Sequence, residues 1–108
     1  MKKFDESYVL LKDMVEDDYY PKFLVDKVKD CIAPVIALLE SGETDKEVIQ
    51  AKLDEMTLTI NDLQDEFYEN NSEIETVARD SIGVTVGYIL DWFGIDIDVE
   101  DAIGERDW

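Results

Sequence analysis

The sequence feature that most constrains this fold is a stripe of apolar side chains between residues 46 and 69. Its members recur in steps of four and three and are Ile49, Leu53, Met56, Ile60, Leu63 and Phe67. This spacing places them on one face of a helix, as in helices that pack in bundles. Thr44 and Glu47 form a capping box before the stripe, and Asn70-Asn71 ends it. We therefore predict a long helix with a buried stripe.

Two more helices are predicted before this one. Apolar residues at helical spacing indicate one helix in residues 7–16 and a second that begins at Pro21 and stops at Ser41-Gly42. Pro34 lies inside the second helix and predicts a kink, with a functional hinge as the alternative. Cys31, surrounded by apolar neighbours, is interpreted as a small core residue.

A further helix is predicted near the end of the chain. Ser72 and Glu75 form a second capping box, from which the helix should reach Phe93. Residues 82–87 combine glycines with β-branched residues, so a strand is the alternative there. Helix is favoured because apolar residues keep a spacing of three and four through this segment. Asp98 is expected to cap a short final turn over residues 99–103.

Length and composition complete the prediction of the fold. The chain has 108 residues, which is one ordinary domain spanning residues 1–108. Short connections should join neighbouring helices in antiparallel order. The predicted fold is therefore all-α, an antiparallel four-helix bundle with a short extra C-terminal helical turn. The apolar runs are too short to cross a bilayer, the start lacks the pattern of a signal peptide, and the single cysteine suits a reducing compartment, so we expect a cytoplasmic protein with no membrane span.

Charge and the absence of histidine narrow the functional classes. The chain contains 28 acidic and 10 basic residues and no histidine, a formal charge of −18. Without histidine, the commonest acid/base group and metal ligand is missing, so we expect no enzyme and no cofactor. Residues 53–108 carry 16 acidic and two basic residues, a net charge of −14. Such a field repels nucleic acid and attracts cationic proteins.

Two acidic segments are the candidate binding residues. The first is Asp17, Asp18, Tyr19 and Tyr20, where adjacent tyrosines beside acids resemble the anchors of protein interfaces. The alternative is local packing, in which Tyr19 lies on Leu24 and Tyr20 fills the end of the bundle. The second segment comprises Asp62, Asp65, Glu66 and Glu69.

The second acidic segment has a metal interpretation as well. Helix-borne carboxylates hold magnesium in some hydrolases, so a magnesium-dependent hydrolase using Asp62, Asp65, Glu66 and Glu69 is the alternative function. A second acidic motif of the required kind is missing from the sequence. Residues 96–107 resemble a calcium loop but have Asp101 where the sharp turn needs glycine. A solvated acidic face is therefore preferred, with no metal predicted.

Several motifs resemble a known family. They are Asp18-Tyr19-Tyr20-Pro21-Lys22, Leu24-Val25-Asp26-Lys27-Val28-Lys29, Ile60-Asn61-Asp62-Leu63-Gln64-Asp65-Glu66-Phe67, Ser72-Glu73-Ile74-Glu75-Thr76, Ala78-Arg79 and Arg106-Asp107-Trp108. They are similar to a family of small acidic bacterial proteins, a domain of unknown function. This resemblance covers most of the chain and implies no catalytic residue, cofactor or partner.

A second resemblance is limited to the tripeptide Tyr19-Tyr20-Pro21. It is similar to the Tyr-Tyr-Pro segment with which helical immunity proteins, small and acidic, block basic nuclease toxins. In this chain the tripeptide precedes the second predicted helix, whereas in the immunity proteins it lies in a short third one. The expected function is accordingly a non-enzymatic, immunity- or inhibitor-like protein that binds a basic protein partner.

Overall fold

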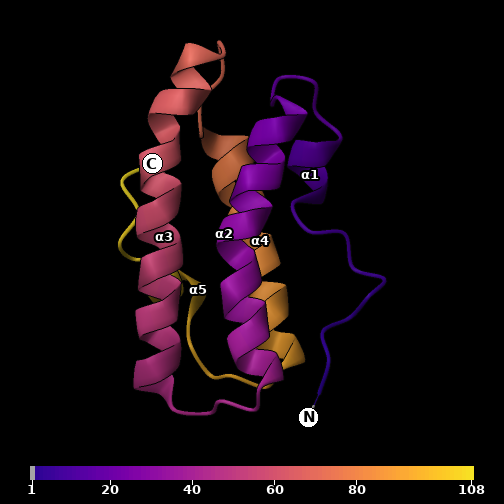
Figure 1. Cartoon of the computed structure of the whole chain (residues 1–108), viewed down its shortest axis with the longest axis vertical. Coiled ribbons are helices and arrows are strands. Elements are labelled where there is room, and N and C mark those ends of the chain that lie inside the picture. Colours follow the sequence, from indigo (N-terminus) through magenta and orange to yellow (C-terminus); the bar gives the residue numbers. More distant parts are fainter. Residues whose placement is uncertain (1) are drawn as a thin grey trace.

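The computed structural model describes residues 2–108 and is helical throughout its regular elements (Figure 1). Its helices are α1 (Lys12–Val15), α2 (Lys22–Glu40), α3 (Lys46–Glu69), α4 (Thr76–Trp92) and α5 (Val99–Ala102). The described residues contain no strand, which confirms the predicted all-α class. Residues 82–87 belong to α4, so the strand alternative for that segment is wrong.

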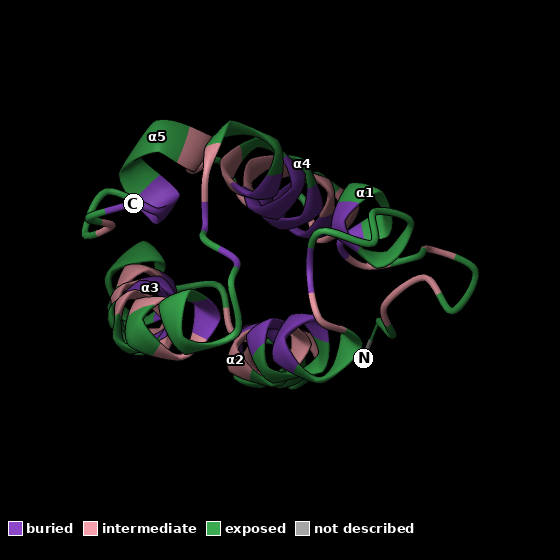
Figure 2. Ribbon diagram, turned by 90° about the horizontal axis from the view of Figure 1, so that it is seen from above, coloured by how far each residue is buried: buried purple, intermediate pink, exposed green. Residues whose placement is uncertain are grey.

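The helices form two layers. Helices α2 and α3 lie antiparallel as a hairpin, and α4, flanked by α1 and α5, covers one side of it (Figures 1 and 2). Figure 2 shows the buried parts of the long helices turned toward the space between the layers. The core therefore lies between the α2–α3 hairpin and α4.

The predicted apolar stripe of α3 forms part of this core. Ile49, Leu53, Met56, Ile60 and Phe67 are buried. The sixth member, Leu63, is only half-buried, and so is Cys31 of α2, a predicted core residue. Both residues are therefore at the edge of the contact between α2 and α3, and the prediction for Cys31 needs this correction.

The first predicted helix is largely absent. Of residues 7–16 only Lys12–Val15 are α-helical, because Leu11 adopts a left-handed conformation with φ 55°. The Leu11 N–H donates to the Thr85 hydroxyl of α4 at 3.0 Å. The segment before Leu11 is instead held by aromatic contacts, in which Phe4 packs with Tyr8, Tyr88, Trp92 and Phe93. Three long helices thus carry the fold in place of the four expected.

Both predicted capping boxes are displaced. Asp45 caps α3 by accepting a hydrogen bond from the Glu47 N–H at 2.9 Å, whereas Thr44 was predicted to do so. Ser72 does not start α4, because its N–H closes the end of α3 on the Phe67 carbonyl at 2.9 Å, next to Asn71 at φ 60°. Glu75 caps α4 instead, with its carboxylate accepting from the Val77 N–H.

The predicted final turn is confirmed and explains Gly87 of α4. Asp98 caps α5 by accepting from the Glu100 N–H at 3.0 Å. Val99 of α5 then packs on α4, where a Cβ at Gly87 would lie 3.1 Å from a Val99 methyl. A glycine at position 87 therefore allows α5 to approach α4 closely.

Candidate functional site

The adjacent tyrosines of the first predicted site occupy different environments. Tyr20 is 3% exposed, and its hydroxyl donates to the Glu75 carboxylate at the start of α4. Tyr19 is 45% exposed, with its ring edge-on to Tyr20 at 5.1 Å between centroids. Packing therefore accounts for Tyr20, which favours the packing alternative for this residue over a role in partner binding. Tyr19 remains available to a partner.

The loop before α2 holds Tyr19 in this position. The Asp17 carboxylate accepts the Tyr19 N–H at 2.9 Å, and the Asp17 carbonyl accepts the Tyr20 N–H at 3.2 Å. The side chains of Asp17 and Asp18 are exposed. The turn thus presents Tyr19 and two carboxylates to solvent from a backbone that is fixed by its own hydrogen bonds.

The predicted acids of α3 lie near the same end of the molecule. Asp62, Asp65 and Glu69 are exposed, and Glu66 is half-buried. Lys27 of α2 bridges to Glu66, with its ammonium 2.7 and 2.9 Å from the two carboxylate oxygens. Because α2 and α3 are antiparallel, this ion pair joins the first half of α2 to the end of α3 (Figure 1). Both predicted acidic segments therefore lie toward the end of the molecule where α2 begins and α3 ends (Figure 1).

Two further aromatic residues, missed by sequence reasoning, belong to this end of the molecule. Phe23 of α2 is 48% exposed and Tyr68 of α3 is 58% exposed. The Lys27 ammonium lies 5.9 Å from the centre of the Phe23 ring. Phe23 directly precedes the buried Leu24, and Tyr68 directly follows the buried Phe67. Each aromatic residue therefore lies on the side of its helix that faces away from the core. In the sequence, such residues can be found as aromatic residues at helix positions outside the three-four spacing of the apolar stripe.

The electrostatic surroundings of Tyr19 include two acids of the segment that leads into α4. Partial burial raises the pKa of the Tyr19 hydroxyl, and the negative charges of Glu73 and Glu75 raise it further. We call the combined region the acidic–aromatic surface, defined by Asp17, Asp18, Tyr19, Phe23, Asp65, Glu66, Tyr68, Glu69 and Glu73.

The same acids do not form a metal site. No three Asp, Glu or Cys side chains within residues 2–108 come close enough together to hold an ion. Glu66 already binds Lys27, and in the calcium-like segment Asp98 caps α5. The arrangement can supply apolar contact area and a negative field to a partner, but it gathers no set of metal ligands.

Across residues 2–108 no helix combines the length and apolar character required to cross a bilayer.

Comparisons with known proteins agree with the resemblance seen in the sequence. Neither the curated proteins nor the solved structures contain a match to the chain. The model of a protein family, described as a family of unknown function (DUF5713), matches residues 4–108. The chain therefore belongs to the DUF5713 family of unknown function.

Proposed function

We propose that this protein is a non-enzymatic binding protein, acting in the cytoplasm, whose acidic–aromatic surface holds a basic protein partner. The observation that carries the proposal is the exposure of Tyr19, Phe23 and Tyr68 among carboxylates at one end of the molecule. Aromatic residues dominate the energetics of protein interfaces, where a few buried anchors provide most of the affinity.

Charge and rigidity support the same function. A net charge of −18 accelerates encounter with a cationic protein by long-range attraction. The Asp17 carboxylate fixes the backbone at Tyr19, and the Lys27 ammonium, which is paired with Glu66, lies over the Phe23 ring. A preformed surface loses less conformational entropy when it binds.

The proposed mode of action is inhibition or neutralisation of the basic partner. The Tyr19-Tyr20-Pro21 likeness to immunity proteins motivates this role, although Tyr20 is buried and only Tyr19 of the pair can touch a partner. Nucleic acid is disfavoured as a direct ligand because phosphates meet the same negative field.

The test is the binding of a purified partner, identified by affinity capture with the full chain as bait and then measured in isolation. Tyr68→Ala should weaken the affinity by at least about tenfold, because it removes an exposed anchor without disturbing the core. Val84→Ala is the matched control, since Val84 is 64% exposed on α4 in the other layer. Its affinity should equal that of the unaltered protein.

The charge argument is tested on the same complex. Raising sodium chloride from 50 to 500 mM should slow association steeply, because salt screens the attraction between the acidic surface and the basic partner. A salt-independent association rate together with full affinity in Tyr68→Ala would contradict the proposal.

A further inference from the structure

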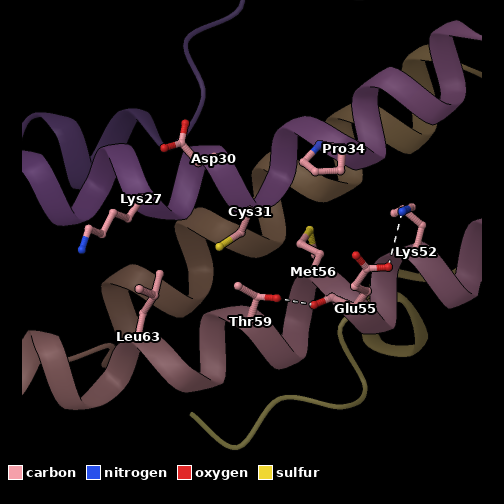
Figure 3. Close-up of a pocket in the computed structure, with 9 residues that line it drawn as sticks. All are labelled: Lys27, Asp30, Cys31, Pro34, Lys52, Glu55, Met56, Thr59 and Leu63. Carbon is pink, nitrogen blue, oxygen red and sulfur yellow. Dashed lines mark hydrogen bonds and ion pairs between the residues drawn. The ribbon is translucent and has the colours of Figure 1, made fainter.

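A cavity of about 320 Å³ lies between α2 and α3, at the edge of the hydrophobic core (Figure 3). Its apolar walls are Cys31 and Pro34 on α2 and Met56 and Leu63 on α3. Figure 3 shows Cys31, Met56 and Leu63 reaching into the gap between the two helices. The volume lies at the lower end of the range for small-molecule sites, and such sites are mostly apolar. We call this cavity the α2–α3 groove.

The groove exists because small side chains meet at this point of the helix pair. Cys31 and Pro34 are short, and Thr59 across the gap is a short, exposed residue whose hydroxyl donates to the Glu55 carbonyl at 2.8 Å. No large side chain of either helix fills the space that remains, so Leu63 and Cys31 stay half-buried. The shape is therefore encoded by residue size.

The charges around the groove cancel. Two lysines and two acids, Lys27, Asp30, Lys52 and Glu55, line it. Lys27 is bound to Glu66, the Lys52 ammonium lies 3.4 Å from the Glu55 carboxylate, and the Asp30 carboxylate points away from α3 (Figure 3). Both lysines that line the groove are thus paired with acids, and the Asp30 carboxylate lies away from the opposite wall. This favours an uncharged ligand.

The two sulfur atoms indicate the kind of uncharged ligand. Both the Cys31 thiol and the Met56 thioether face the gap (Figure 3). Burial, followed by the charge of Asp30, raises the pKa of the Cys31 thiol, which keeps it neutral. Neutral sulfur makes favourable contacts with aromatic rings, about 0.3–1.5 kcal/mol each.

We propose that the α2–α3 groove binds a small, uncharged aromatic molecule, held between the sulfur atoms of Cys31 and Met56. This site does not depend on the proposed protein partner, because the groove opens between the helices and its walls include none of the exposed aromatic residues of the acidic–aromatic surface.

The test uses indole as the probe and the full ¹⁵N-labelled chain. Titration followed by NMR should show saturable shifts concentrated at Cys31, Met56 and Leu63. Thr59→Trp places a ring in the groove and should weaken indole binding by about tenfold or more. Leu58→Trp adds the same ring at the neighbouring position, which is 50% exposed and does not line the groove. It should change the affinity less than about twofold.

Three results would overturn this proposal. The first is indole binding that leaves the groove residues unshifted or is equal in the two tryptophan variants. The second is tighter binding of indole-3-acetate than of indole, which would mean that the lysines select an anion. The third is a dimer in sedimentation experiments that Thr59→Trp dissolves and Leu58→Trp retains, because a second copy would then occupy the groove. None of these results bears on the acidic–aromatic surface, so the two proposals fail separately.

Discussion

At the scale of single residues, the contact between Asp5 and Tyr88 shows how the chain before α1 is held without a helix. The Tyr88 hydroxyl donates to the Asp5 carboxylate at 2.6 Å, and the Tyr8 ring stacks on Tyr88 at 3.9 Å between centroids. The bond from Tyr88, followed by those from Ser7, lowers the pKa of Asp5, and the bond to Asp5 raises the pKa of Tyr88. Each shift favours the folded form over a defined range of pH.

The sign of each contribution follows from the direction of the shift. Asp5 has a lower pKa in the folded chain, so its stabilisation is present above the unfolded pKa and is lost as the pH falls through the folded pKa. Tyr88 has a higher pKa in the folded chain, so its stabilisation is present below the unfolded pKa and is lost as the pH rises through the folded pKa. Between these limits, the contact holds the segment on α4.

Tyr88→Phe should therefore raise the pKa of Asp5 toward its ordinary value. The variant keeps the ring but removes the hydroxyl that donates to the carboxylate. The measurement is a ¹³C NMR titration of the Asp5 carboxyl group. Tyr8→Phe is the control, because that ring stacks on Tyr88 while the hydrogen bond to Asp5 comes from Tyr88 itself. An unchanged Asp5 titration in Tyr88→Phe would show that the hydroxyl does not set this pKa.

At the scale of elements, competition for backbone N–H groups decides where helices begin. The Glu43 carboxylate accepts the N–H groups of Thr44 and Asp45 at 3.2 and 3.0 Å. The Thr44 N–H, which the predicted capping box needs for Glu47, is therefore already bonded to Glu43. Asp45 caps α3 instead, by accepting a hydrogen bond from the Glu47 N–H. At the other end of α3, Ser72 completes the closing turn and Glu75 begins α4. A capping pattern in sequence therefore locates a helix start only within a few residues.

Asp45→Ala should lower the free energy of unfolding by about 0.5–2 kcal/mol, the usual cost of losing an N-cap side chain. Thr44→Ala should have a much smaller effect, because the Thr44 side chain makes no capping hydrogen bond to α3. Urea denaturation of both variants measures the difference. If Thr44→Ala lowers the free energy of unfolding more than Asp45→Ala does, Thr44 is the N-cap of α3, as the sequence pattern predicts.

At the scale of the whole molecule, charge and packing oppose each other. A formal charge of −18 destabilises a folded chain through repulsion among its carboxylates. Only four ion pairs are found in residues 2–108, and they join exposed or partly exposed side chains. Such pairs contribute little to stability. The two-layer core must therefore outweigh the repulsion.

Added salt should consequently stabilise the isolated protein. Raising sodium chloride from 10 to 200 mM should raise the melting temperature, because screening weakens the repulsion between carboxylates. Differential scanning calorimetry checks this. The same change should weaken the complex with a basic partner, so salt should act in opposite directions on folding and on binding. A melting temperature that falls with added salt would contradict this account.

Much of the fold could be predicted from local pattern. The stripe from Ile49 to Phe67, the glycine stop at Gly42 with φ 93°, and the Asp98 cap are all confirmed. The segment before Leu11 could not be predicted, because its conformation depends on Thr85 and Tyr88, more than seventy residues away in the chain. Local spacing carries no information about such contacts.

The acidic–aromatic surface could likewise be predicted from the sequence only in part. The sequence indicated Asp17, Asp18, Tyr19 and the acids of α3, but it could not separate Tyr19 from Tyr20. That separation depends on Glu75, which accepts the hydrogen bond of the Tyr20 hydroxyl from 55 residues away in the chain. Phe23 and Tyr68 were missed for a related reason, since exposure is a property of the assembled helices.

By itself the sequence determined that this protein is helical, where its three long helices run, and that it carries a strong negative charge. Helical periodicity, glycine stops and charge are properties of neighbouring residues, so they need no knowledge of the assembled chain. Only the tertiary structure decided which aromatic residues stay exposed, which helix caps are used and where the α2–α3 groove opens. These features arise when distant segments compete for the same hydrogen bonds and the same buried space.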